Sequence, residues 1–141
     1  MGNNAISMNV NKSVLINDLK LKQFSNTTIF RRDRIFVLSP SSQNEYQWFD
    51  IRRANLNRYI AQEMNGHLVV RFKENLLWAN LSLFVNSMIT EESIVYTSSI
   101  REHWKFNIVI SDERYLAVNR KSKQICELSL LSVQQLKDKV Y

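Results

Sequence analysis

Hydrophobic and polar residues alternate along much of the last third of the chain, which is the pattern of strands that bury one face. In the clearest run, apolar side chains recur at every second position: Trp104, Phe106, Ile108 and Ile110. The strands expected from this pattern span residues 94–97, 103–110, 115–119 and 124–128. Together they predict a β-meander. A helix that Ser132 caps and that continues to Val140 is expected to follow it.

In the middle of the chain the spacing becomes helical. Apolar residues at four-residue steps, with Tyr59 beside them, predict a helix over residues 54–64 that Asn65-Gly66 ends in a left-handed conformation. A strand is expected over residues 67–72. A second, largely buried helix is expected over 76–89, although its portion at 78–81 could equally be extended.

The first third is less regular. Residues 13–24 fit a short helix, which we favour, or a strand in which leucines alternate with lysines. The β-forming residues at 29–38 predict one bent strand or a hairpin that turns at the charged run Arg31–Arg34. The loop at 39–44 is expected to join residues 35–38 to residues 45–51 as an antiparallel hairpin.

The pattern as a whole indicates an α+β fold. A flexible N-terminal arm (1–12) is expected to precede a single domain (13–141), because 141 residues is close to the common domain size. We expect a mixed or antiparallel sheet that includes the C-terminal β-meander and is packed by two to three helices.

Cysteine usage and hydropathy indicate a cytoplasmic protein. Cys126 is the one cysteine, so an internal disulfide is excluded and a reducing compartment fits. No run approaches the roughly 18 apolar residues of a membrane span, and the polar first residues lack the apolar segment of a secretion signal.

Catalytic and metal-binding patterns are sparse. His67, His103 and Cys126 do not have the paired spacing of a zinc site, so we expect no metal, and two glycines cannot form a phosphate loop, so we expect no cofactor. A metal-dependent nuclease would need converging carboxylates. Asp50 is its best first acid, but the strand expected at 67–72 contains no carboxylate to complete the site.

Charge favours a polyanion as partner. Lysine and arginine total 19 against 13 acidic residues, which gives a net charge of +6. The basic residues gather at 31–34, at 52–58 and in a turn at 120–123. The arginines could hold phosphates, and Trp48 or Tyr46 could stack on a base. The residues expected to contact nucleic acid are Arg31, Arg32, Arg34, Trp48, Arg52, Arg53 and Arg58.

The sequence therefore favours a non-catalytic module that binds DNA or RNA. The alternative is a protein-interaction module, such as an adaptor, an inhibitor or a subunit of a larger complex, because aromatic residues and arginine are also enriched at the centres of protein interfaces. The nuclease with an acid at Asp50 is a third, less favoured hypothesis. Oligomeric state is left open.

Overall fold

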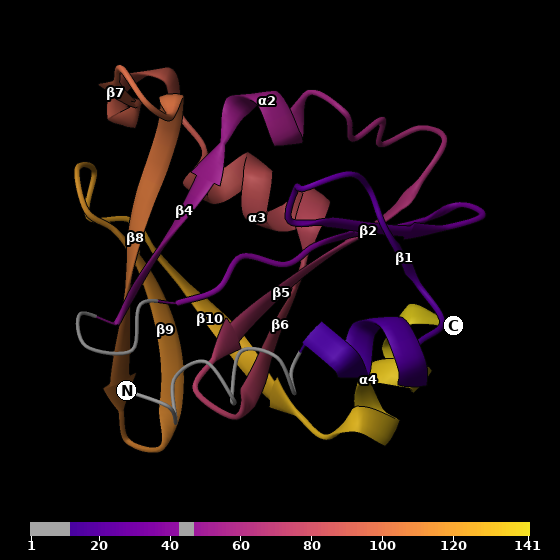
Figure 1. Ribbon diagram of the computed structural model, residues 1–141. Helices are drawn as coiled ribbons and strands as arrows, with labels where there is room; N and C mark the ends of the chain where they lie inside the picture. Colours follow the sequence, from indigo (N-terminus) through magenta and orange to yellow (C-terminus); the bar gives the residue numbers. More distant parts are fainter. Residues whose placement is uncertain (1–11, 43–46) are drawn as a thin grey trace.

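A ten-stranded mixed sheet forms the body of the structure, a computed structural model that describes residues 12–42 and 47–141 (Figure 1). Its strands are β1 (Lys22–Gln23), β2 (Ile29–Arg32), β3 (Ile35–Leu38), β4 (Trp48–Arg52), β5 (Asn65–Phe72), β6 (Asn75–Asn80), β7 (Val95–Thr97), β8 (Arg101–Ser111), β9 (Arg114–Asn119) and β10 (Ile125–Leu131). The helical segments are η1 (Val14–Asp18), α2 (Arg53–Leu56), α3 (Leu81–Met88), η2 (Glu91–Ser93) and α4 (Val133–Val140).

The strands lie in the order β1-β2-β3-β5-β6-β10-β9-β8-β4, and β7 pairs with β8 beside this path. β3 and β5 are parallel, and the other neighbouring strands of the described part of the chain are antiparallel. The expectation of a mixed or antiparallel sheet with packed helices is met by a mixed sheet, with more helical segments than the two to three expected. The consecutive antiparallel strands β8, β9 and β10 are the meander that the alternating pattern indicates.

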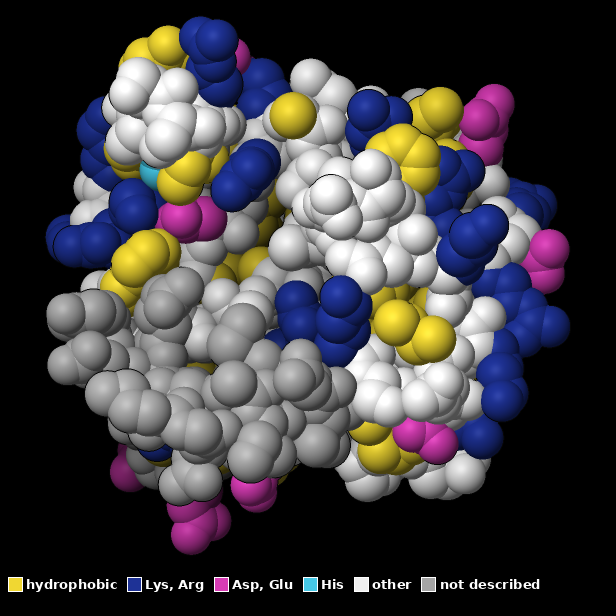
Figure 2. All heavy atoms as spheres, in the orientation of Figure 1, with side chains coloured by type: hydrophobic (Ala, Val, Ile, Leu, Met, Phe, Trp, Pro, Cys, Tyr) yellow, Lys and Arg dark blue, Asp and Glu magenta, His cyan; other side chains and the backbone are white. Residues whose placement is uncertain are grey.

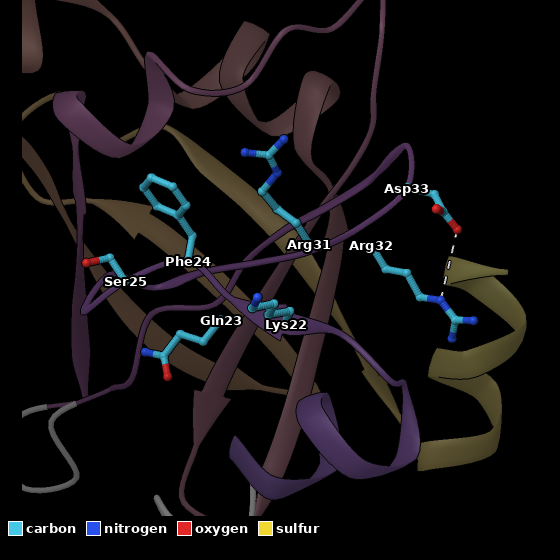
Figure 3. Close-up of a pocket in the computed structure, with 7 residues that line it drawn as sticks. All are labelled: Lys22, Gln23, Phe24, Ser25, Arg31, Arg32 and Asp33. Carbon is cyan, nitrogen blue, oxygen red and sulfur yellow. Dashed lines mark ion pairs between the residues drawn. The ribbon is translucent and has the colours of Figure 1, made fainter.

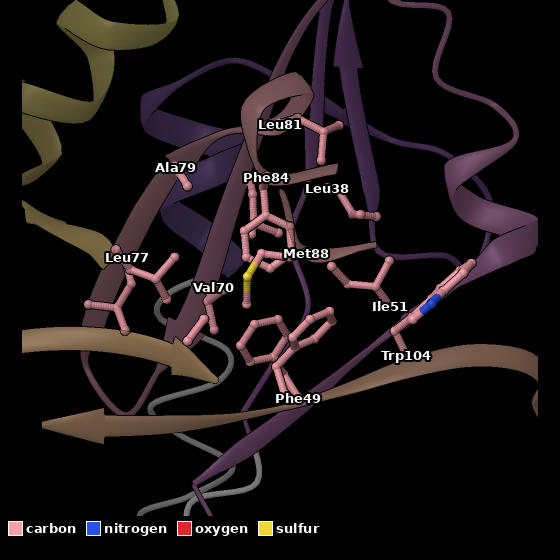
Figure 4. Packing of buried hydrophobic residues seen from close by; sticks show 14 of the residues in the cluster. Leu38, Phe49, Ile51, Val70, Leu77, Ala79, Leu81, Phe84, Met88 and Trp104 are labelled. Atoms are coloured by element: carbon pink, nitrogen blue, oxygen red, sulfur yellow. The ribbon is translucent and has the colours of Figure 1, made fainter. Parts of the chain in front are cut away.

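The main hydrophobic core lies between the two wings of this sheet. Figure 1 shows α3 between the wing that contains β8 and β9 and the wing that contains β1, β2 and β3. Side chains from both wings meet Phe84 and Met88 of α3 in one buried cluster, which Figure 4 shows. Phe106 of β8 is at its centre, with its ring 5.2 Å from the rings of both Phe49 and Phe84.

A second core covers the other face of the wing that contains β1, β2 and β3. Here η1 and α4 pack on the strands through apolar side chains that include Leu15, Leu136 and Val140. The predicted cap of the last helix is confirmed, because the Ser132 hydroxyl accepts from the backbone N–H of Gln135 at 3.1 Å and the Gln135 side chain accepts in return from Ser132 N at 2.9 Å.

Residues 29–38 form the hairpin, not the bent strand. β2 and β3 pair antiparallel from Ile29↔Leu38 to Arg32↔Ile35. Asp33 turns the chain with a φ of 54°, a conformation that aspartate tolerates better than most residues. For residues 13–24, both the helix and the strand considered from sequence are present in part. η1 is a short helical turn, and Lys22–Gln23 is a strand.

The helix expected over 54–64 is wrong beyond Leu56, where α2 ends. Leu56, Tyr59 and Met64 still pack against the core, but Ile60 is 44% exposed. The chain continues in turns, and Tyr59 reaches inward to bond Ser82 at 2.6 Å, a contact that the four-residue apolar spacing does not reveal.

Asn65-Gly66 is the beginning of β5 and not a helix end, so this expectation is also wrong. Gly66 does not have a positive φ. Its small size serves packing, because a Cβ atom at this position would lie 2.5 Å from the Tyr59 ring. The glycine thus admits the aromatic ring that covers it.

The hairpin expected between residues 35–38 and 45–51 does not form. β3 pairs with β2 and β5, whereas β4 lies at the far edge of the sheet beside β8. The segment after β3 runs along β5 instead of reversing: Arg71 N donates to Pro40 O, Ser42 N donates to Arg71 O, and the Ser39 hydroxyl donates to Val69 O. These bonds satisfy backbone groups of the loop, whereas the buried hydroxyls of Ser41 and Ser42 have no hydrogen-bond partner among the described residues.

The second expected helix begins late. Residues 75–80 form β6, and α3 begins at Leu81 after Asn80, whose side chain accepts from Leu83 N. The alternative prediction that residues 78–81 are extended is therefore confirmed for residues 78–80. The expected N-terminal arm lies outside the described residues except for Lys12.

Candidate nucleic-acid interface

The structure separates the basic residues singled out in the sequence into two groups. Arg52, Arg53 and Trp48 belong to β4 and the start of α2, at one edge of the sheet. Arg31, Arg32 and Arg34 lie on the β2–β3 hairpin beside the opposite edge. Tyr46, the alternative stacking residue, lies outside the described residues.

Arg58 belongs with the second group. Its guanidinium carbon lies 4.5 Å from the centre of the Phe24 ring, a cation–π contact between the segment after α2 and the end of β1. Asn55 also reaches this end, where its amide donates to the Thr28 hydroxyl at 3.3 Å. The turns that follow α2 thus bring Arg58 from one edge of the sheet to the other.

Arg53 is engaged in contacts with neighbouring side chains at the surface. Its guanidinium lies 2.6 Å from Glu91 and 3.4 Å from Glu102 and sits over the Trp104 ring at 5.0 Å. The hydrogen bond to Glu91 is the main cause that raises the pKa of Arg53, and the charges of both glutamates add to it. The arrangement ties α2 to η2 and β8 and leaves Arg53 little capacity for a phosphate.

Trp48 and Asp50 share one cation. Lys105, opposite Asp50 on β8, places its ammonium 3.4 Å from the carboxylate and 4.1 Å from the centre of the Trp48 ring. One face of Trp48 is therefore covered. Within residues 12–42 and 47–141, no three histidine, cysteine, aspartate or glutamate side chains group as a metal site would require, around Asp50 or elsewhere.

The second group of basic residues surrounds an open pocket of about 480 Å³ (Figure 3). We call it the basic pocket; it is lined by Lys22, Gln23, Phe24, Ser25, Arg31, Arg32 and Asp33. Lys22 and Arg31 are directly opposite each other on β1 and β2, so both side chains are on the same face. Figure 3 shows Arg31 and Phe24 projecting to the same side, while Arg32 points toward α4.

Positive charge prevails around this pocket. Among the described residues, Asp33 is the only acidic one that lines it, and its carboxylate lies 4.0 Å from Arg32. Arg32 also donates to the Tyr141 hydroxyl at 3.4 Å, and Arg34 donates to Glu63 O at 3.1 Å. In Figure 2, lysine and arginine side chains gather over the part of this face where Figure 1 places β1, β2 and the β2–β3 turn.

Two members of the basic pocket, Lys22 and Phe24, were not expected from the sequence. If residues 13–24 are interpreted as a strand, the pattern indicates an exposed basic face, because leucines alternate with lysines there and the lysines must then share the solvent face. A helical reading of this segment hides it.

A second polar site, also not expected, contains His67. The indole of Trp78 donates to His67 Nδ1 at 3.0 Å, and the imidazole is 7% exposed. Burial lowers the pKa of His67 below its ordinary value of 6.5, because the charged form loses hydration. His67 is therefore neutral in the folded protein at neutral pH.

The lowered pKa makes stability sensitive to mild acid. Below pH 6.5 the unfolded chain gains a proton on His67 before the folded protein does, so unfolding is favoured as the pH falls toward the lowered pKa. This one proton is expected to contribute a loss of at most about 1.4 kcal/mol per pH unit. Urea unfolding at pH 7.5 and 5.0 measures it.

His67→Gln is the matched variant, because a glutamine oxygen can still accept from Trp78 but does not titrate. Its loss of stability between the two pH values should be smaller than that of the unmodified protein. Equal losses would show that His67 is not the group responsible.

No helix in the described part of the chain is long and apolar enough to cross a membrane. Comparison of the chain with models of known families, with curated proteins and with solved structures finds no match in any of the three.

Proposed function

We propose that the protein binds nucleic acid through the basic pocket, without catalysing a reaction. The observation that supports this most is the lining of the pocket: it includes Lys22, Arg31, Arg32 and the Phe24 ring, and the carboxylate of Asp33 already lies next to Arg32. Arg58 adds a further cation at the Phe24 ring. Arg53, which was expected from sequence to contact nucleic acid, is not part of this proposed interface, because its guanidinium is paired with Glu91 and Glu102.

The proposed mechanism is electrostatic, with stacking as support. Lys22, Arg31 and Arg58 hold successive phosphates and release the counterions that those phosphates had condensed. Arg58 covers one face of Phe24, and a base stacks against the part of the ring that lines the pocket. Such contacts carry little sequence information, so we propose binding to single strands with weak sequence preference.

Removing three of these charges tests the proposal. In Lys22→Ala/Arg31→Ala/Arg58→Ala, the affinity for a fluorescent single-stranded oligonucleotide should fall about tenfold or more, and the slope of log affinity against log salt should decrease by about two units. Fluorescence anisotropy over a salt series measures both, and circular dichroism checks that the variant is folded.

The control removes the same charge elsewhere. Arg120, Lys121 and Lys123 lie in the turn between β9 and β10, on the other wing of the sheet. Replacing these three with alanine should change the affinity much less. If both triple variants weaken binding equally, net charge alone attracts the oligonucleotide and the basic pocket is not the interface.

A protein partner is the second candidate, and one observation favours it. An apolar row crosses the outer face of β8, β9 and β10, where Val109 is opposite Leu116 and Val118 is opposite Ile125. Val109 is 42% and Ile125 60% exposed. If the protein acts through this face, Ile125→Lys should abolish its partner binding while oligonucleotide affinity is unchanged.

A further inference from the structure

A separate pocket of about 420 Å³ lies where β5, β6, the start of α3 and α4 meet. We call it the His67 pocket; it is lined by Tyr59, Ala61, Met64, Asn65, Gly66, His67, Asn80, Ser82, Lys139, Val140 and Tyr141. It shares no lining residue with the basic pocket. No aspartate or glutamate side chain is among its lining residues, although it is mainly polar.

His67 is a hydrogen-bond donor in this pocket. An indole N–H can only donate, so the Trp78 bond at 3.0 Å requires His67 Nδ1 to be the acceptor. The proton of the neutral ring is then on Nε2. Nε2 has no hydrogen-bond partner among the described residues, although the side chain is 7% exposed and lines the pocket. Its N–H is therefore left for a ligand.

Asn80 contributes a second donor. Its side-chain oxygen is used as the cap of α3, where it accepts from Leu83 N at 3.1 Å. The NH₂ end of the same amide is then left to donate. Asn80 is directly opposite His67 in the β5–β6 pair, so both residues are on the same side of the sheet.

The hydroxyls of Tyr59 and Ser82 add a third donor. They are 2.6 Å apart, and one of them donates to the other. Two hydroxyls that share one hydrogen bond retain one O–H between them for a further acceptor. Gly66 permits this placement, because any larger residue there would collide with the Tyr59 ring.

Lys139 of α4 supplies the charge. Its ammonium is held 4.7 Å from the centre of the Trp78 ring, the same indole that orients His67. No carboxylate lies within 4.0 Å of it in the described part of the chain. The pocket thus combines one positive charge on α4 with donors from β5, from β6 and from the Tyr59–Ser82 pair.

From these donors we propose that the His67 pocket binds a phosphate monoester group. A phosphate has three terminal oxygens that each accept hydrogen bonds and about −1.5 to −2 charges, which suits several donors from different directions better than a planar carboxylate does. The volume exceeds that of the phosphate alone, and Tyr59 and Tyr141 offer aromatic surface for the rest of a ligand. A nucleoside monophosphate has this chemistry.

The test follows the indole N–H resonance of Trp78, which reports on the His67 bond, in ¹⁵N-labelled protein. Trp78→Phe identifies the resonance. Titration with a nucleoside monophosphate should shift it with saturation, inorganic phosphate should shift it more weakly, and the nucleoside without phosphate should leave it in place. Failure of the nucleoside monophosphate to produce a saturable shift would overturn the proposal.

Two variants on α4 distinguish binding in the His67 pocket from attraction by the positive charge of the protein as a whole. Lys139→Gln should weaken binding of the nucleoside monophosphate by about tenfold, because it removes the charged donor. Lys137→Gln removes the same charge from a residue that does not line the pocket, and affinity should be unchanged. Equal weakening in both would contradict a defined site.

A phosphate monoester also occurs at the 5′ end of a nucleic-acid strand. Oligonucleotides with a 5′-phosphate and with a 5′-hydroxyl distinguish the two sources: a shift of the Trp78 resonance by the phosphorylated strand alone assigns the pocket to strand ends, and no shift by either assigns it to the free nucleotide. The basic-pocket variant Lys22→Ala/Arg31→Ala/Arg58→Ala should still bind the nucleoside monophosphate, so the two sites can fail independently.

Discussion

Replacing Phe106 with alanine is expected to lower the free energy of unfolding by about 3–5 kcal/mol. Phe106 is fully buried, and its ring lies 5.2 Å from those of Phe49 on β4 and Phe84 on α3. The substitution therefore leaves a cavity where three elements meet and removes two aromatic contacts at once. Urea unfolding followed by fluorescence measures the loss.

Val109→Ala is the matched control for Phe106. It is on the same strand but faces outward and is 42% exposed, so it should change stability by no more than about 0.5 kcal/mol. A loss below about 1 kcal/mol for Phe106→Ala would mean that the two wings do not depend on this cluster for their packing.

Asn119→Leu is expected to be similarly damaging, at about 3–5 kcal/mol, because about 1–3 kcal/mol is lost for each buried polar group left without a partner. The Asn119 amide is 1% exposed and donates to Met88 O and to the Ser93 hydroxyl, both at 3.0 Å. Its oxygen accepts from the backbone N–H groups of Lys121 and Ser122. One side chain thus joins β9 to the end of α3, to η2 and to the next turn.

The comparison is with Asn107→Leu, on the outward-facing side of β8 opposite Val118. That variant should unfold at nearly the same urea concentration as the unmodified protein, within about 0.5 kcal/mol. If the two asparagine variants are equally stable, the hydrogen bonds of Asn119 contribute no more than the leucine gains by burial.

The elements that could be predicted from sequence are those whose partners are next to them in the chain. In the β8–β10 meander the apolar residues follow a period of two, and in the β2–β3 hairpin β-forming residues flank a charged turn; in both, each strand pairs with its neighbour in the chain. The last helix has its cap and apolar stripe within eight residues. For such elements, local pattern and tertiary pairing agree.

The expectations that failed concern distant pairing. Residues 35–38 and β4 look like hairpin partners because a short polar loop separates them, yet β4 pairs with β8. No local signal identifies a strand some fifty positions away. The helix expected through Met64 ends at Leu56, and Tyr59 in the turns that follow bonds Ser82, a residue of another element.

The basic residues show the same limit. Arg53 and Arg58 look equivalent in sequence, but Arg53 lies beside Glu91 and Glu102 whereas Arg58 lies on Phe24. Which arginine has charge to spare depends on residues more than thirty positions away. Spacing along the chain can place arginines on one element, but it cannot identify the carboxylates that fold against them.

The position of β4 has a consequence for synthesis of the chain. Its antiparallel partner on β8 is made about 50 residues later, which at about 5–20 residues per second is a delay of roughly 3–10 seconds on the ribosome. During that interval Phe49 and Ile51, which end up 1% and 2% exposed, have no β8 to cover them. β4 therefore exposes core side chains on the nascent protein for several seconds, which is the kind of surface that chaperones protect.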